Sequence, residues 1–282
     1  MPGLPIPAGT VEKRAQVNGL TIRYLEAGEW DGGRGTLLLL HGFGARSEVW
    51  YRVLKDLSKE WRVIAPDLPC HGGSSQLPGK ARTLPMYRDA LERFVDAVVP
   101  GHFTLVGSSM GGALAAMLAV SRAPRVDRLV LLDAAGLTPK MPGKTVRLYF
   151  PYVLGAYLMA PSAGRFRSFL RKGVFYDPKF IDERWIEFLV PEWKDHAKRS
   201  SYLATANCLR RPDASVSGIL GHIKCPTLAL WGEEDQHFAW KENETAVERI
   251  PGARFVVFEK CGHLPMVEKY PESLAKVREF LS

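Results

Sequence analysis

A serine bracketed by glycines, between a short apolar run and an alanine-rich run, is the feature that most limits how this chain can fold. Residues 103–106 predict a buried strand, and residues 112–121 have the composition of a helix packed closely on a sheet. The stretch 107–111 between them leaves room only for a sharp turn. Side chains two positions before and after the serine would collide in such a turn, and glycines remove that collision. The sequence therefore predicts a strand, a tight turn and a helix, with Ser109 at the tip.

The same turn indicates chemistry at Ser109. A strained backbone would hold the hydroxyl out of the surface, and the backbone N–H of Met110 would open a helix whose positive dipole end faces the same spot. A nucleophile and one donor of an oxyanion hole would then come from one turn. The alternative for the motif alone is a glycine- and serine-rich turn with a purely structural role.

A second oxyanion donor is expected from the loop that follows residues 36–40. These residues are apolar throughout, as in a strand covered on both faces, and they lead into His41, Gly42, Phe43 and Gly44. Glycines directly after a buried strand let backbone N–H groups turn into a cleft. We expect Phe43 to supply the donor through its N–H and its ring to wall a substrate pocket, and we interpret His41 as structural.

An acid and a base follow two late strands. Residues 227–231 and 254–258 each predict a strand, and Asp235 and His263 lie in the loops after them. Acyl transfer at a serine needs a base to take the hydroxyl proton and a carboxylate to orient that base. We therefore predict a catalytic triad of Ser109, Asp235 and His263.

Other residues compete for these roles. Asp133 also ends a predicted strand and could replace Asp235 as the acid, with Glu234 as a weaker alternative. His237 could act as the base on spacing alone, although its ring would have to point back from the acid loop. Asp67 also follows a strand, and we expect it to accept backbone N–H groups in its own loop.

The order of the elements predicts an α/β fold with a mostly parallel, doubly wound sheet. Strands are expected near 20–26, 36–40, 62–65, 103–106, 127–133, 227–231 and 254–258, and helices over 47–60, 84–99, 112–121 and from Pro271 onward. In such sheets a ligand binds beyond the carboxyl ends of the strands, where Phe43, Ser109 and Asp133 fall.

The alternation stops between residues 137 and 222, where aromatic and basic residues gather. We expect a helical cap inserted over the crevice, with apolar side chains facing a substrate, between core segments 1–136 and 223–282. Asp177 and Pro178 predict the start of one of its helices.

The net charge of +8 lies mostly in that insertion, which holds 14 Lys and Arg against 7 Asp and Glu. This asymmetry is compatible with an anionic substrate, peripheral contact with a lipid surface, or simply solvated helix faces. No motif supports nucleic-acid binding, and the sequence leaves the oligomeric state open. The longest apolar run, 149–160, is interrupted by Pro151 and Gly155 and is too short to span a bilayer. With no secretory signal in the first ten residues, we expect a cytoplasmic protein.

The four cysteines, Cys70, Cys208, Cys225 and Cys261, show no metal-binding or redox spacing, so free buried thiols are expected. The predicted chemistry requires neither a metal nor an organic cofactor. Its partner would be a small-molecule ester.

The motifs together resemble the α/β-hydrolase superfamily, in particular its serine esterase and lipase branch, including bacterial lipases and monoacylglycerol lipases. They are HGFG at 41–44, DLPCHGGSS at 67–75, VGSSMGG at 106–112, WGEEDQHF at 231–238 and CGHLPMVE at 261–268. The chain order of nucleophile, acid and base agrees with that family. The resemblance implies an α/β-hydrolase fold and an acyl-enzyme mechanism, with Phe43 and Met110 at the oxyanion positions.

Single positions bear on the sister activities of that superfamily. Dehalogenases and epoxide hydrolases with a similar order of motifs carry Asp at the tip of the turn between strand and helix (the nucleophile elbow), where this chain has Ser109. Carbon–carbon bond hydrolases usually have Trp after the catalytic histidine, and here Leu264 follows, which we also expect to line the pocket. Carbon–carbon bond hydrolysis or lactone hydrolysis is the second expectation, and a non-catalytic binding protein the third. Cys70 departs from the family pattern, which usually has Gly at that place.

Overall fold

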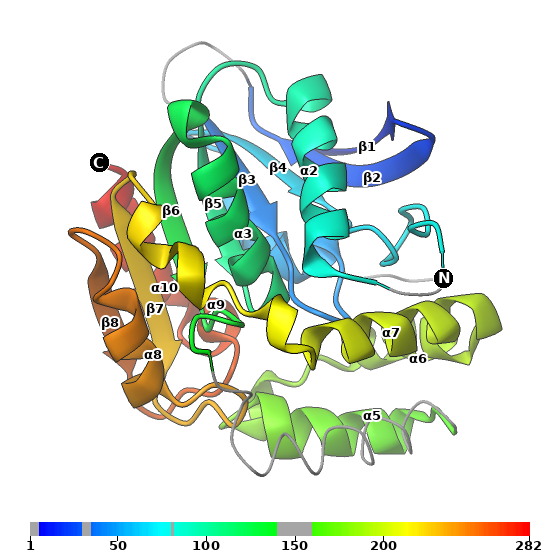
Figure 1. Ribbon diagram of the computed structural model, residues 1–282. Helices are drawn as coiled ribbons and strands as arrows, with labels where there is room; N and C mark the ends of the chain where they lie inside the picture. Colours follow the sequence, from blue (N-terminus) through cyan, green and yellow to red (C-terminus); the bar gives the residue numbers. More distant parts are fainter. Residues whose placement is uncertain (1–5, 30–34, 80–81, 140–159) are drawn as a thin grey trace.

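One eight-stranded sheet runs through the protein. The computed structural model describes residues 6–29, 35–79, 82–139 and 160–282. The strands lie in the order β1-β2-β4-β3-β5-β6-β7-β8 (Figure 1). β1 pairs antiparallel with β2, and β2 pairs antiparallel with β4, while every later pair is parallel. The expected fold, a mostly parallel doubly wound sheet, is confirmed.

Strands and helices alternate along most of the chain. The strands are β1 (Thr10–Val17), β2 (Leu20–Ala27), β3 (Thr36–Leu40), β4 (Arg62–Pro66), β5 (Phe103–Ser108), β6 (Val126–Leu132), β7 (Thr227–Gly232) and β8 (Arg254–Phe258). The α-helices are α1 (Tyr51–Leu57), α2 (Leu84–Val98), α3 (Met110–Ser121), α5 (Ala163–Phe169), α6 (Glu183–Lys194), α7 (His196–Leu209), α8 (Trp240–Val247), α9 (Pro265–Glu268) and α10 (Tyr270–Leu281).

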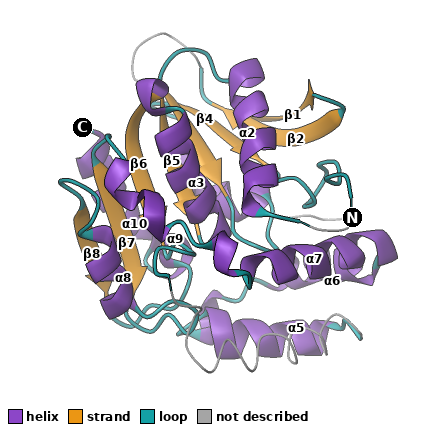
Figure 2. Ribbon diagram, viewed as in Figure 1, coloured by secondary structure: helices purple, strands orange, loops and turns teal. Residues whose placement is uncertain are grey.

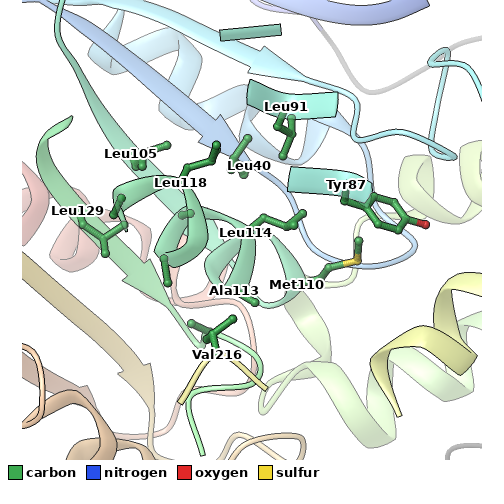
Figure 3. Packing of buried hydrophobic residues seen from close by; sticks show 14 of the residues in the cluster. Leu40, Tyr87, Leu91, Leu105, Met110, Ala113, Leu114, Leu118, Leu129 and Val216 are labelled. Carbon is green, nitrogen blue, oxygen red and sulfur yellow. The ribbon is translucent and has the colours of Figure 1, made fainter. Parts of the chain in front are cut away.

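Apolar side chains on both faces of the sheet explain why the central strands β3 and β5, and β7 beside them, are buried along their whole length. In β3, Leu38 and Leu40 belong to one core cluster, and Leu37 and Leu39 belong to the other, as the two-residue period of a strand requires. The first cluster packs the sheet against α2 and α3, as Figure 3 shows for Leu40, Leu91 and Leu114. The second joins the opposite face to α1 and α10. Figure 2 shows the resulting order of helix, sheet and helix.

Three local expectations differ from the structure. β1 was not predicted, because it is an edge strand whose residues are mostly exposed and carry charges, so it lacks an apolar signal. The helix expected over 47–60 begins later: Ser47–Trp50 form a 3₁₀ turn and α1 starts at Tyr51, while the Ser47 hydroxyl donates to Asp67 and accepts from Arg23. Asp177 does cap the turn after it, but that turn is a three-residue 3₁₀ segment and the next helix starts at Glu183.

Helices α5, α6 and α7 lie together beyond the carboxyl ends of the strands (Figure 1). They fall inside the expected cap, 137–222, but residues 140–159 of that cap lie outside the described residues, as does most of the apolar run 149–160. The division into 1–136, 137–222 and 223–282 therefore stays a prediction. In the described part of the chain, no helix combines the length and apolar character needed to cross a bilayer.

Candidate active site

Ser109 sits in a strained turn between β5 and α3. Its backbone has φ 53° and ψ −120°, in a region that residues with a side chain rarely occupy. The turn is held by the Ser109 N–H, which donates to the Leu132 carbonyl at 3.0 Å, and by the Ser109 carbonyl, which accepts from the Ala135 N–H at 2.9 Å. These bonds anchor the turn to the neighbouring strand β6 and to the loop that follows it. The local geometry is the one the glycine spacing predicts.

Gly111 is required by close backbone approach. A Cβ atom at Gly111 would lie 2.1 Å from the Leu40 carbonyl oxygen, and one at Gly107 would lie 2.4 Å from the Gly111 oxygen. Neither oxygen can move without disturbing a buried strand or the turn itself. The two glycines therefore let α3 start directly against β3 and β5.

We predict that Gly111→Ala destabilises the protein by about 3 kcal/mol or more, because the methyl group overlaps backbone that cannot relax. Urea unfolding of both proteins measures the change. Gly164→Ala is the matched control, since nothing lies within 4 Å of a Cβ built there, on an open face of α5. A Gly111→Ala protein as stable as the parent would contradict the turn geometry described above.

Asp235 and His263 meet at the ends of β7 and β8. Nδ1 of His263 lies 2.9 Å from Oδ2 of Asp235, and both residues are buried. Burial opposes ionisation of Asp235, but the attraction of His263 and their hydrogen bond outweigh it, so the pKa of Asp235 lies below its usual range. An ionised carboxylate holds the ring with Nδ1 protonated, which leaves Nε2 as the basic nitrogen.

The competing acids and bases have other environments. Glu234 is exposed, whereas Asp235 and His263 are buried. His237 reaches Asp235 through its backbone N–H, which donates to Oδ1 at 2.8 Å, and its ring stands edge-on to the His263 ring with centroids 4.6 Å apart. Burial lowers the pKa of His237 to about 4, so its imidazole is neutral near pH 7. Asp133 is fully buried, and one of its carboxyl oxygens lies within 4.8 Å of a polar atom of each member of the pair.

The loop that carries His263 is fastened to residues between α5 and α6. The His263 N–H donates to the Val174 carbonyl at 2.7 Å. The Glu268 carboxylate accepts from the N–H of Gly262 at 2.7 Å and from the N–H groups of Tyr176 and Asp177 at 2.9 and 3.0 Å. One buried side chain thus ties the base loop to the helical segment that covers the site.

The loop expected to hold the second oxyanion donor rests on buried polar groups. Nε2 of His41 accepts from the Leu68 N–H at 2.9 Å, which agrees with a structural role for this histidine. The Asp67 carboxylate accepts from the N–H groups of Ser47 and Gly73, each at 2.8 Å, and forms an ion pair with Arg23 at 2.9 Å. Asp67 therefore satisfies loop N–H groups, as expected.

The backbone conformation at Cys70 explains why the family pattern usually has Gly at this position. Its φ is +69°, in the left-handed region that favours glycine. Its sulfur accepts from the Leu77 N–H at 3.3 Å, so the side chain bridges the loop that it strains. All four cysteines are buried free thiols, as the sequence predicts.

Ser109 and His263 border the same cavity, whose volume is about 170 Å³. Phe43 and Leu264, which the sequence predicts to line a substrate pocket, also border this cavity. Its other walls come from the loop after β3, from helices α5 and α6 with the segment between them, and from the loop after β7 and helix α9. Large apolar side chains dominate those walls: Val49, Phe166, Phe169, Leu170, Val174, Trp185, Phe188, Leu189, Trp193, Phe238 and Met266.

Several residues at this site were not identified from the sequence. Arg46 and Ser108 border the cavity, and the Ser108 hydroxyl is buried without a hydrogen-bond partner among the described residues. Trp193 packs its ring on Tyr202, with centroids 4.9 Å apart, and both rings contact Phe43 edge-on. Of these residues, only Ser108 could have been found from the sequence, because it directly precedes the predicted nucleophile. The aromatic contacts depend on how α6 and α7 pack against each other and against the loop after β3.

Comparisons with known proteins agree with the fold described above. Residues 35–270 match the family model described as the alpha/beta hydrolase fold. The chain is 27% identical to the monoacylglycerol lipase abhd6-A of Xenopus laevis over 89% of this chain and 76% of that protein. It is 28% identical to a 2-hydroxy-6-oxononadienedioate/2-hydroxy-6-oxononatrienedioate hydrolase of Burkholderia vietnamiensis over 93% of this chain and 91% of that protein.

Among solved structures, the chain is similar to a crystal structure of a membrane phospholipase A described as a bacterial virulence factor. The identity is 30%, the TM-score is 0.81, and the match covers 97% of this chain and 86% of that one. The family match covers strands β3 to β8 and includes Ser109, Asp235 and His263. The elbow geometry around Ser109, the topology of the sheet and these matches lead to one conclusion: the chain belongs to the α/β-hydrolase family.

Proposed function

We propose that this protein hydrolyses neutral, apolar carboxylic esters through an acyl-enzyme formed on Ser109. The hydrogen bond between Asp235 and His263 supports the proposal, together with a cavity that both Ser109 and His263 border. The lipase and phospholipase among the similar proteins are consistent with ester cleavage. The proposed residues are the triad Ser109, Asp235 and His263, with the N–H groups of Phe43 and Met110 as oxyanion donors.

In the proposed reaction, His263 takes the proton of the Ser109 hydroxyl as the oxygen attacks the ester carbonyl. The N–H groups of Phe43 and Met110 stabilise the oxyanion that develops, each worth on the order of 3 kcal/mol of barrier. The imidazolium gives its proton to the leaving alcohol. Water then attacks the acyl-enzyme with His263 as the base again, and Ser109 is released.

We infer a neutral, apolar substrate from the apolar lining of the cavity. Among the described lining residues, Arg46 is the only Lys, Arg, Asp or Glu. Its guanidinium already pairs with Glu48, with nitrogen–oxygen distances of 2.6 and 2.5 Å, and lies 3.6 Å from Glu192. It also covers the ring of Phe188 at 3.9 Å. A carboxylate on the acyl group would therefore meet a cation that is already neutralised.

The test compares two p-nitrophenyl esters of matched acyl length, the butyrate and the hemisuccinate. We predict a kcat/KM at least about 100-fold higher for the butyrate, because burying an unpaired carboxylate in an apolar cavity costs several kcal/mol. From acetate upward, each added methylene should raise kcat/KM by up to about fourfold until the acyl chain fills the cavity. Equal rates on butyrate and hemisuccinate would contradict the proposed substrate class.

Carbon–carbon bond hydrolysis is the second candidate, because the Burkholderia relative is named for a dienedioate substrate. Such a substrate carries carboxylates, so the same comparison bears on it: preference for an anionic ring-cleavage product over neutral esters would favour this second activity. A non-catalytic role is tested separately with an organophosphorus probe. Labelling at Ser109 supports a hydrolase, and no labelling supports a binding protein.

A further inference from the structure

We propose that Asp133 is a protonated, neutral positioning residue that donates a hydrogen bond to Asp235 and holds it toward His263. This role differs from that of an alternative triad acid, which would have to be ionised and to contact the imidazole itself. The inference rests on the proposed triad, and the experiments below separate a failure of the one from a failure of the other.

The first support is the position of Asp133 at the end of β6. Its backbone has φ +42°, a strained conformation for a residue with a side chain, and its N–H donates to the Leu230 carbonyl at 3.1 Å. The side chain is fully buried. One polar side-chain atom from each of Asp133, Asp235 and His263 lies within 4.8 Å of the other two. The strained turn at Asp133 thus places a second carboxyl group next to Asp235 and His263.

The second support is the unequal pairing of the two Asp133 oxygens. Oδ1 accepts from the Gly232 N–H at 3.0 Å. Oδ2 is buried, and no hydrogen-bond donor reaches it from the described residues. A buried carboxylate oxygen without a donor is costly, whereas a protonated Oδ2 is itself a donor and needs only an acceptor. The adjacent Asp235 carboxylate is such an acceptor.

Electrostatics favour the same assignment. The titratable groups near Asp133 are Asp235 after β7, Cys261 and His263 after β8, and Glu268 on α9. Burial, and then the negative charge of Asp235, raise the pKa of Asp133 well above its ordinary value. Asp235 instead pairs with His263 and has a lowered pKa. Two adjacent buried carboxyl groups therefore divide into one acid and one carboxylate.

The proposed bond would orient Asp235 from behind. Asp235 accepts from Nδ1 of His263 and from the His237 N–H, and a third donor would leave its carboxylate little freedom to turn. The donor also spreads the negative charge of Asp235, so that it orients the imidazole without holding the imidazolium too strongly. Asp133 would act only through Asp235, without touching a substrate.

Kinetics of two variants test the hydrogen bond. Asp133→Leu has a similar shape but no donor, and we expect kcat/KM for p-nitrophenyl butyrate to fall about tenfold and the acid limb of its pH profile to move to higher pH. Asp133→Asn keeps an acceptor for Gly232 and a donor for Asp235, so it should recover most of the loss and keep the acid limb within about 0.3 pH unit of the parent. If Asp133 were ionised, Asn would remove a negative charge near His263, and the acid limb would move down by about one unit. That shift would overturn the proposal.

A second measurement detects the proton without using activity. An infrared difference spectrum between the parent and Asp133→Asn at pH 7 should show the C=O band of a protonated carboxyl group in the parent only. The band would be present even if the protein did not cleave esters, so this result is independent of the proposed function. Absence of the band overturns the proposal. Loss of parent activity in EDTA would also overturn it, since a cation would then occupy the place assigned to the proton.

The pH dependence of unfolding follows from the same proton. An unfolded Asp loses its proton near pH 4, whereas folded Asp133, with its raised pKa, keeps it. The stabilisation is therefore complete below about pH 4 and is lost as pH rises toward the folded pKa. Between about pH 5 and 7, the unfolding equilibrium constant of the parent relative to Asp133→Asn should rise by up to about tenfold per pH unit. A ratio that stays constant over this range contradicts a retained proton.

Discussion

Ser109→Ala should lower kcat for p-nitrophenyl butyrate by on the order of 10⁵-fold or more, to a rate near the background set by binding and oxyanion donors alone. The reason is chemical, since a methyl group cannot attack the ester or carry the acyl group. The fold should persist, because the turn depends on the backbone bonds of Ser109 to Leu132 and Ala135 and not on its hydroxyl. Steady-state rates, with circular dichroism as a check of folding, measure the effect.

Ser121→Ala is the matched control for this change. Ser121 is the last residue of α3, the helix that Ser109 precedes, and it is exposed at the end away from the cavity. Its replacement should leave kcat within about twofold and unfolding within about 0.5 kcal/mol of the parent. If Ser109→Ala kept a substantial fraction of the parent activity, the acyl-enzyme mechanism would be wrong.

Asp235→Asn should lower kcat by on the order of 10⁴-fold. Asn keeps the size of the side chain, but its amide group can present N–H to the imidazole and so favour the tautomer in which Nε2 cannot accept the Ser109 proton. The buried pair would also lose its charge, which stabilises the imidazolium formed during attack. Single-turnover rates would show the loss in the acylation step.

Glu234→Gln controls for the change of a neighbouring carboxylate to an amide. Glu234 is exposed and adjacent to Asp235 in the chain, so its replacement should alter kcat by less than about twofold. Equal losses in both variants would mean that the loop, and not the Asp235 carboxylate, is responsible. High activity in Asp235→Asn would return Asp133 to consideration as the acid.

Glu268 connects the loop that carries His263 to the segment between α5 and α6. Glu268 binds the N–H of Gly262, next to His263, and also the N–H groups of Tyr176 and Asp177. Burial raises the pKa of Glu268, while these N–H groups act in the opposite direction. Movement of the segment between α5 and α6 would therefore shift the loop that positions the proposed base, His263. This contact could not be foreseen, because it joins residues about ninety positions apart.

The sequence by itself determined the parts of this protein that depend on local constraints. Apolar and alternating stretches placed seven of the eight strands, glycine spacing placed the turn at Ser109, and the order of serine, aspartate and histidine indicated the superfamily. These features can be predicted because strand periodicity and turn sterics act over a few residues.

Only the tertiary structure decided which groups meet. It joined Asp235 to the ring of His263 rather than to that of His237, and it paired Arg46 with two glutamates. It also placed Asp133 beside that pair with one carboxyl oxygen that no donor from the described residues reaches. Burial and charge at these sites depend on neighbours from distant strands and helices, and the same residue type ionises or stays neutral accordingly. Protonation and the polarity of the cavity are therefore properties of the folded chain, and they are what the proposed chemistry and substrate class depend on.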